Sequence, residues 1–342
     1  MVFFSSEDER TLITDLLYSH YWAPFLSFAA AFVMLRWLVK GGLSRIGLDR
    51  PNPRSLHTSP VPRTGGLGLM FGVFISFLLL LPPWPLWIAL ALLIAISLLD
   101  DIHGISPVWR LPAHFLAAGI AAVLWFDTGG VLLLPLFILA TAWMTNLYNF
   151  MDGSDGLAGG MAVLGFGFYG LASWLAGNED FALINFSIAA AALAFLLFNF
   201  HPAQIFMGDA GSIPLGFLAA ALGITGYLQN IWPIWFPLLI FSPFIVDASV
   251  TLLKRALNRE KIWQAHRGHY YQRLVQIGWG HRKTAWFEYA LMLVAGLSAL
   301  WAIGKDEFTQ IVLVAGWCAA YTLGMIIFDR YWKRHSGNYV SA

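Results

Sequence analysis

Apolar residues along this chain are gathered into long runs that are separated by short polar stretches. A helix needs about 20 apolar residues to cross the hydrocarbon core of a bilayer, with a range of about 17–25. Eleven runs predict such helices, at about 22–40, 66–82, 84–99, 111–126, 131–148, 156–176, 181–199, 212–228, 232–253, 285–303 and 308–328. We therefore expect an all-α, polytopic integral membrane protein with about 11 transmembrane helices, folded as a single domain over residues 1–342.

The composition agrees with a lipid environment. Hydrophobic residues make up 58% of the chain and charged residues only 11%, against about 25% charged residues in ordinary soluble domains. One soluble core could not cover so much apolar surface without leaving large exposed patches. The formal net charge is +1, which argues against nucleic acid as a partner.

The distribution of Lys and Arg predicts how the helices are oriented, because cytoplasmic loops collect these residues. With the N-terminus outside and eleven crossings, only Arg10 and Lys305 of the 20 cations lie outside. Ten crossings would place the terminal group of Arg330, Lys333 and Arg334 outside. We therefore expect a cytoplasmic C-terminus and two long cytoplasmic loops, at about 41–65 and 254–284.

The same topology places six carboxylates at the cytoplasmic ends of the predicted helices. Ionisable residues at membrane depth cost at least about 2.5–3.5 kcal/mol each on insertion scales, and they usually mark a functional site. An aspartate beside a helix start can simply be an N-cap, but one cap does not need two adjacent aspartates. Together the six carboxylates predict a divalent metal such as Mg²⁺, which takes one or two carboxylates and leaves room for substrate phosphates. The six are Asp100, Asp101, Asp152, Asp155, Asp209 and Asp247.

Five polar segments at this face carry the candidate chemistry. Glycines at a helix start, such as Gly65 and Gly66, offer backbone N–H groups to an anion. In the third segment polar residues recur every three positions, which on a helix would place them along one face. The His and Arg residues of the last segment are suited to gripping a diphosphate or polarising a leaving group. The segments are 54–66, 100–104, 146–158, 206–212 and 265–274.

With these five segments in order from about Asp49 to Arg273, the chain resembles the polyprenyl-phosphate N-acetylhexosamine-1-phosphate transferases. This integral membrane family includes the phospho-MurNAc-pentapeptide translocase and the enzymes that initiate O-antigen synthesis. The resemblance implies transfer of a sugar 1-phosphate from a UDP-N-acetylsugar to undecaprenyl phosphate, with release of UMP. It also implies a bacterial inner-membrane location with the active site facing the cytoplasm, and leaves a homodimer as one alternative for assembly.

The resemblance further implies roles for individual residues. Asp100 and Asp101 match the paired aspartates near the lipid phosphate, and one of them is the expected catalytic base. Asp209 matches the principal Mg²⁺ ligand, with Asp100 as a second ligand and Mn²⁺ as an alternative ion. His266 and His269 match the catalytic histidine motif. The substrate-binding residues are expected to be Arg54, Arg63, Asn146, Asn149, Asp152, Asp155 and Arg267.

Two departures from the family pattern refine these expectations. Many relatives carry a Lys where this chain has Ser55, so the phosphate-gripping role is expected to pass to Arg54 or Arg63. The histidine motif reads His-Arg-Gly-His, which resembles the subgroup that starts O-antigen chains on N-acetylfucosamine, N-acetylquinovosamine or N-acetylglucosamine.

Direct attack by the lipid phosphate is the expected mechanism, because Mg²⁺ and loop cations can screen the repulsion between anions.

Three other classes of membrane protein compete with this interpretation. An ion-coupled transporter also uses intramembrane carboxylates, but it would place them near the midplane in a repeated layout. An intramembrane aspartyl protease would need a Gly-x-Gly-Asp signature, which Phe206 breaks at its first position. A CDP-alcohol phosphotransferase would follow Asp152-Gly153 with Ala-Arg, which this chain lacks. The transporter remains the main alternative.

Overall fold

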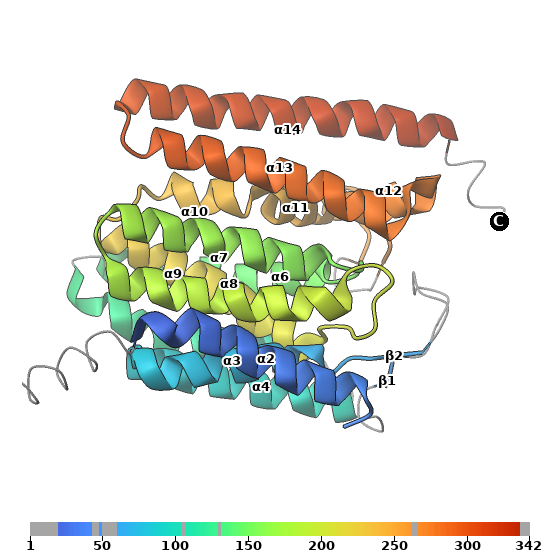
Figure 1. Cartoon of the computed structure of the whole chain (residues 1–342). Coiled ribbons are helices and arrows are strands. Elements are labelled where there is room, and N and C mark those ends of the chain that lie inside the picture. Colours follow the sequence, from blue (N-terminus) through green and yellow to red (C-terminus); the bar gives the residue numbers. More distant parts are fainter. Residues whose placement is uncertain are drawn as a thin grey trace, which may run out of the picture.

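The structure is a computed structural model that describes residues 20–42, 48–49, 60–103, 107–128, 131–261 and 266–335. Within these ranges the chain is predominantly helical, and most helices run side by side (Figure 1). Its strands form a short antiparallel pair, β1 (Leu48–Asp49) and β2 (Val61–Pro62), with Leu48 opposite Pro62. The expected all-α fold is therefore confirmed.

The helices follow one another along the chain with short connections. Their bounds are η1 His20–Trp22, α2 Ala23–Val39, α3 Gly65–Leu80, α4 Trp84–His103, α5 Pro107–Ala121, η2 Ala122–Thr128, η3 Val131–Leu133, α6 Leu134–Met151, α7 Leu157–Leu175, α8 Glu179–Asn199, α9 Asp209–Leu228, α10 Trp235–Ile240, α11 Ser242–Leu257, α12 Tyr270–Leu274, η4 Val275–Trp279 (a π-helical turn), α13 Gly280–Ala302 and α14 Glu307–His335.

Seven helical segments in the described ranges are long and apolar enough to cross a membrane, and two shorter apolar helices accompany them. Each of the eleven apolar runs predicted from the sequence overlaps a helix or a pair of helices. The chain is thus a multi-pass membrane protein. The number of crossings and the sides of the two termini stay predictions.

Local sequence explains where several helices begin and end. Helix α3 ends at Leu80, and its C-cap, Leu81, has a left-handed conformation. Pro82 and Pro83 follow directly, and proline cannot continue a helix. Asn178 caps α8 by accepting a hydrogen bond from the Phe181 N–H at 3.2 Å. The predicted run at 232–253 is divided into α10 and α11 at Phe241, and Pro243 lies in the first turn of α11.

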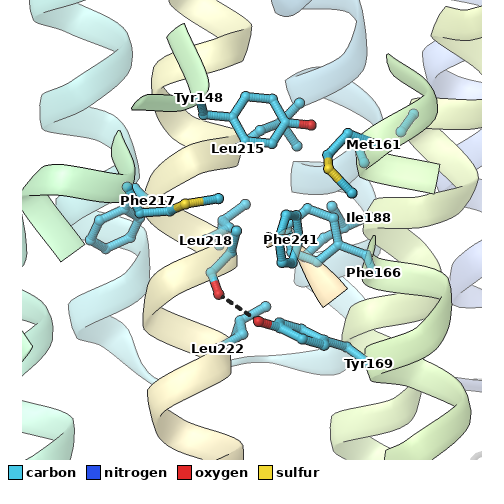
Figure 2. Packing of buried hydrophobic residues seen from close by; sticks show 14 of the residues in the cluster. Tyr148, Met161, Phe166, Tyr169, Ile188, Leu215, Phe217, Leu218, Leu222 and Phe241 are labelled. Carbon is cyan, nitrogen blue, oxygen red and sulfur yellow. Dashed lines mark hydrogen bonds between the residues drawn. The ribbon is translucent and has the colours of Figure 1, made fainter. Parts of the chain in front are cut away.

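Buried aromatic and aliphatic side chains hold the centre of the bundle together. Figure 2 shows Tyr148, Phe166, Tyr169, Leu218 and Phe241 packed between helices, and all five are almost fully buried. The hydroxyl of Tyr169 donates to the Ala219 carbonyl at 3.1 Å, so this buried polar group is satisfied. The last helix, α14, lies outermost in Figure 1, and its apolar window is not buried inside the protein, as expected for a lipid-facing helix.

Successive helix ends meet at one end of the bundle. Helices α4, α6 and α8 end there, whereas α3, α5, α7 and α9 begin there. The short pair β1–β2 and helix α12 lie at the same end in Figure 1. Because the polar segments of the sequence are the connections between these helices, the topology gathers them at one end of the bundle.

Candidate active site

The centre of the site is a guanidinium held between two carboxylates. Arg110, in the first turns of α5, places Nη1 2.6 Å from Asp100 Oδ2 and Nη2 2.6 Å from Asp209 Oδ2. The three side chains are only 13–22% exposed. Asp100 comes from the end of α4 and Asp209 from the first residue of α9, where the helix dipole favours a negative charge. Arg110 therefore joins three helix ends into one cluster.

Asn149, near the end of α6, completes this cluster. Its side-chain amide is oriented by its neighbours, so that the nitrogen lies 3.2 Å from Asp209 Oδ1 and 2.9 Å from Ser212 Oγ. Its oxygen then accepts from Arg110 Nη2 at 3.0 Å. We name Asp100, Arg110, Asn149 and Asp209 the carboxylate cluster.

Asp152 lies beside the carboxylate cluster at the C-cap of α6. Burial, together with the nearby charge of Asp209, raises the pKa of the Asp152 carboxyl well above its ordinary value, and Arg63 partly offsets this effect. The exposed Arg63 and the cluster are therefore electrostatically coupled to Asp152, and added positive charge at this point would favour its ionised form.

Glycines bring the loop before α3 against the loop before α9. The amides of Gly65 and Gly66 donate to the carbonyls of Phe206 (2.9 Å) and Met207 (2.7 Å). The expectation that this glycine pair offers its N–H groups to an anion is therefore wrong, because both groups are used within the protein. A Cβ on Gly66 would lie 2.3 Å from the Gly211 nitrogen, so the pair is needed for close approach of α3 to α9.

Gly208 brings Arg63 next to the start of α9. Its backbone is in the left-handed region (φ 69°), and a Cβ at this position would lie 2.3 Å from the Arg63 carbonyl oxygen. Glycine adopts this conformation at little cost, whereas other residues do not. The segment that contains Arg63 and the segment that contains Gly208 thus meet directly before Asp209.

Asp155 belongs to a second group of polar side chains. Its Oδ2 lies 2.6 Å from His201 Nδ1 and accepts from the Ala203 N–H at 3.2 Å. His281 stacks on His201 with ring centroids 5.3 Å apart, and its Nδ1 lies 2.8 Å from Ser154 Oγ. Asp155 thereby ties the start of α7 to the loop after α8 and to α13.

The histidine loop forms a third group. His266 and His269 stack with centroids 4.8 Å apart, and His269 is buried. The hydroxyl of Tyr271 donates to the Phe150 carbonyl at 3.2 Å, and so attaches this loop to the end of α6 beside Asn149. A Cβ on Gly153 would lie 2.2 Å from the Tyr271 hydroxyl, which explains why this position is a glycine.

The structure brings some of the predicted residues together and separates others. Asp100, Asn149 and Asp209 share one cluster, with Asp152 and Arg63 beside it. Asn146 turns back to its own helix and donates to the Ala142 carbonyl at 2.7 Å. Arg267 accepts from Gln276 through its backbone carbonyl at 3.1 Å. Arg54, Ser55 and the side chain of Asp101 lie outside the described part of the chain.

From the sequence, Arg110 counts only as an inside cation, and His281 has no role in the site. Asp247 is one of the six carboxylates and Ser212 ends the fourth polar segment, but neither has a role of its own. A signal for Arg110 was present, because it is the one cation between 64 and 253 and lies at a helix start. The partners of Asp247 and His281 could not be identified from spacing, because they lie on other helices.

The donor set fits Mg²⁺ and does not fit a metal cage built by protein alone. No group of three or more His, Cys, Asp or Glu side chains among the described residues is arranged to hold a metal ion. Asp100 and Asp209 nevertheless present carboxylate oxygens to a single cationic group. Mg²⁺ is usually bound by one or two carboxylates, together with water and substrate phosphates. Asp100 and Asp209 would supply these two carboxylates.

The fold and this site define a multi-pass membrane protein with a carboxylate-rich site at one end of its helices. Comparison with known proteins identifies the class further. Residues 83–227 match the model of glycosyl transferase family 4. This match includes the whole carboxylate cluster and the polar segment that contains Asp152 and Asp155.

Curated relatives extend the similarity to most of the chain. A protein of Mycolicibacterium smegmatis named decaprenyl-phosphate N-acetylglucosaminephosphotransferase is 31% identical, over 78% of this chain and 77% of its own. Undecaprenyl-phosphate alpha-N-acetylglucosaminyl 1-phosphate transferase of Yersinia pestis is 28% identical over 94% and 93%. "Probable undecaprenyl-phosphate N-acetylglucosaminyl 1-phosphate transferase" of Bacillus subtilis is 28% identical over 77% and 79%.

The chain belongs to glycosyl transferase family 4, the polyprenyl-phosphate N-acetylhexosamine-1-phosphate transferases. The resemblance inferred from its five polar segments is confirmed. The family assignment also excludes the main alternative, an ion-coupled transporter.

Proposed function

We propose that this protein transfers a sugar 1-phosphate from a UDP-N-acetylhexosamine to undecaprenyl phosphate and releases UMP. The observation that carries the proposal is the carboxylate cluster, in which Arg110 holds Asp100 and Asp209 at the ends of apolar helices. A water-soluble nucleotide and a membrane-bound phosphate can both reach such a position. The names of the relatives support a polyprenyl phosphate as acceptor and N-acetylglucosamine as the first sugar to test.

Asp209 and Asp100 are the residues that would hold Mg²⁺. When bound, this ion neutralises charge on the diphosphate of the nucleotide sugar, which is the main electrostatic barrier to the reaction. Mn²⁺ offers the same oxygen-ligand chemistry and is the alternative ion.

The chemical step is the formation of one P–O bond and the cleavage of another. An oxygen of the lipid phosphate attacks the phosphorus atom that bears the sugar, and the bond from that phosphorus to UMP breaks. Arg110 orients the carboxylates, while Arg63, Arg267 and His266 are the proposed ligands of phosphate oxygens. Asp100 or Asp101 is the proposed base that keeps the lipid phosphate deprotonated. The residues at the site thus position two anions and screen their repulsion.

We further propose that the protein lies in the bacterial inner membrane with this site facing the cytoplasm, where UDP-sugars are available. The excess of Lys and Arg in the loops at the same end of the helices supports this orientation. The product would initiate O-antigen or a related envelope polysaccharide. An N-acetylglucosamine, N-acetylfucosamine or N-acetylquinovosamine donor fits this role, and a homodimer is one assembly to test.

The direct test uses purified protein in detergent with Mg²⁺, undecaprenyl phosphate and each UDP-N-acetylsugar in turn, and measures UMP. We expect UMP only when donor, acceptor lipid and Mg²⁺ are all present. Asp209→Asn should abolish turnover and leave the protein folded, because the amide keeps its size but loses the charge that Mg²⁺ requires. Arg36→Gln, an exposed change on α2, is the matched control.

Two results would contradict parts of this proposal. Absence of UMP with every UDP-sugar in the panel would refute the transferase activity. A burst of UMP without undecaprenyl phosphate, or exchange of labelled UMP into UDP-sugar without it, would refute direct attack and favour a covalent intermediate.

A further inference from the structure

Asp247, in the middle of α11, has four hydrogen-bond partners although its side chain is only 7% exposed. Its Oδ1 accepts from the Tyr270 amide (2.9 Å) and the Thr251 hydroxyl (3.1 Å), and its Oδ2 accepts from the Tyr271 amide (3.0 Å). The fourth partner is the ring of His269, whose Nδ1 lies 3.3 Å from Oδ1. A carboxylate without a proton can accept from all four partners.

This arrangement determines which nitrogen of His269 carries the proton in the neutral ring. A neutral imidazole has one donor nitrogen and one acceptor nitrogen, and the partner of one nitrogen sets the state of the other. An ionised Asp247 can only accept, so Nδ1 donates to it and Nε2 is left for another partner.

The second histidine of the motif has the opposite arrangement. His266 Nδ1 accepts from the Gly268 amide at 3.1 Å, so its proton lies on Nε2. Burial, followed by the positive charges of His269 and Arg255, lowers the pKa of His266 to about 4. His266 is therefore neutral at physiological pH and can only donate a hydrogen bond through Nε2. The two stacked rings are not equivalent.

Contacts outside the loop hold the His269 ring against the end of α6, next to Asn149 of the carboxylate cluster. The Phe150 ring stacks on His269 with centroids 6.5 Å apart, and the Phe150 carbonyl accepts from the Tyr271 hydroxyl. Phe150 directly follows Asn149 of the cluster. The charged and titratable groups that surround the Asp247–His269 pair are Arg255 on α11, His266 in the loop, Tyr270, Tyr271 and Arg273 on α12, and Glu288 on α13.

We propose that Asp247 is a positioning residue that holds His269 with its proton on Nδ1 and so makes Nε2 the nitrogen that delivers a proton to the leaving phosphate. The protonated ring donates from Nδ1 to Asp247 and from Nε2 to UMP. As the bond between UMP and the transferred phosphorus breaks, the Nε2 proton passes to the UMP oxygen, and solvent later restores it. This step rests on the proposed transferase function, whereas the tautomer does not.

The tautomer is tested on the intact protein without substrate. In ¹⁵N-histidine-labelled protein in detergent micelles, long-range ¹H–¹⁵N correlation distinguishes protonated from unprotonated ring nitrogens. His269→Gln identifies the His269 signals by their loss. We expect the neutral His269 ring to carry its proton on Nδ1 in the wild type and on Nε2 in Asp247→Asn, where the amide can donate to Nδ1. A wild-type ring protonated on Nε2 would overturn the proposal, whatever the enzymatic activity.

The kinetic test compares Asp247→Asn with Thr251→Val, which removes a donor from the same carboxylate without touching His269. We expect kcat of Asp247→Asn to fall on the order of 10- to 100-fold, with little change in KM for the UDP-sugar. The alkaline limb of its pH–kcat profile should move to lower pH, because the ring that donates the proton loses the negative charge beside it. Thr251→Val should keep the limb in place and lower kcat far less.

Asp247→Glu keeps the proposal testable if Asp247→Asn does not fold. The glutamate retains the charge but displaces the ring, so it should preserve the Nδ1 proton and the position of the alkaline limb while lowering kcat. If an active wild type shows equal losses in Asp247→Asn and Thr251→Val with unmoved limbs, Asp247 is only structural. If the wild type has no transferase activity, the proposed function fails, and the spectrum alone decides the tautomer.

Discussion

Arg110 and Asp209 form an ion pair of 2.6 Å between the beginnings of two helices that are far apart in the sequence. The same guanidinium holds Asp100 through its other terminal nitrogen. Two carboxylates brought together without a cation would repel each other, and Arg110 relieves this repulsion. The pairing explains how acidic residues can gather at the end of an apolar bundle.

The first prediction concerns this guanidinium. Arg110→Gln should lower kcat/KM roughly 10²-fold, because removing one partner of a largely buried charge pair costs about 2–5 kcal/mol. Arg110→Lys should recover only part of the loss, since a point charge cannot bridge two carboxylates as a planar fork does. UMP release measures both, with Arg36→Gln as control. Wild-type kcat/KM in Arg110→Gln would remove Arg110 from the site.

The second prediction uses the raised pKa of Asp152. A carboxyl whose pKa is raised in the folded state contributes stability below its ordinary pKa, and this contribution is lost as the pH rises through the folded-state pKa. Asp152→Asn cannot ionise, so it should unfold at a higher temperature than the wild type near pH 8. The gain in unfolding temperature should be roughly 2–4 °C per kcal/mol and should vanish near pH 3. The activity of Asp152→Asn should be lower than that of the wild type.

Asp306→Asn is the control of opposite sign for this experiment. Hydrogen bonds from the Thr309 hydroxyl and amide lower the pKa of Asp306, which lies in the exposed turn before α14. Its contribution to stability is present above the ordinary pKa and is lost as the pH falls. Asp306→Asn should therefore unfold at a slightly lower temperature at pH 8. A lower unfolding temperature for Asp152→Asn at pH 8 would contradict the second prediction.

The third prediction tests the close approach of α3 and α9. The three atoms nearest to a Cβ on Gly66 would be backbone atoms, the nearest being the Gly211 nitrogen at 2.3 Å. Gly66→Ala should thus destabilise the protein by about 1–3 kcal/mol and displace Asp209, which lowers turnover. Gly167→Ala on α7 is the matched control, because no atom lies within 4 Å of its Cβ. Thermal unfolding and UMP release in both variants decide this, and equal behaviour would refute it.

The fourth prediction concerns orientation. Helix α7 begins beside Asp155 and ends near Gly177, so the turn between α7 and α8 lies at the opposite end of the bundle from the site. A topology reporter inserted at Gly177–Asn178 should read external, and one fused after Ala342 should read cytoplasmic. An external signal after Ala342 would contradict eleven crossings. An internal signal at Gly177 would contradict a cytoplasmic site.

The sequence by itself determined the membrane class, the positions of the helices and the identity of the polar segments. This was possible because in lipid every backbone N–H and C=O must be satisfied within its own helix, so a long apolar run has few alternatives. The carboxylates were visible for the same reason, because a charge at the edge of such a run is costly and conspicuous.

Only the tertiary structure decided which polar residues meet. Asp100 and Asp209 share Arg110, Asp155 is bound by His201, and Asp247 holds His269, although all four aspartates looked alike in the sequence. These pairings depend on how helices far apart in the chain pack. Glycines such as Gly66 and Gly208 allow that packing, because a Cβ at either position would lie 2.3 Å from a backbone atom of another segment. Hydrogen bonds and close ion pairs form only when the two atoms come within about 3 Å of each other. Spacing along the chain therefore cannot predict them.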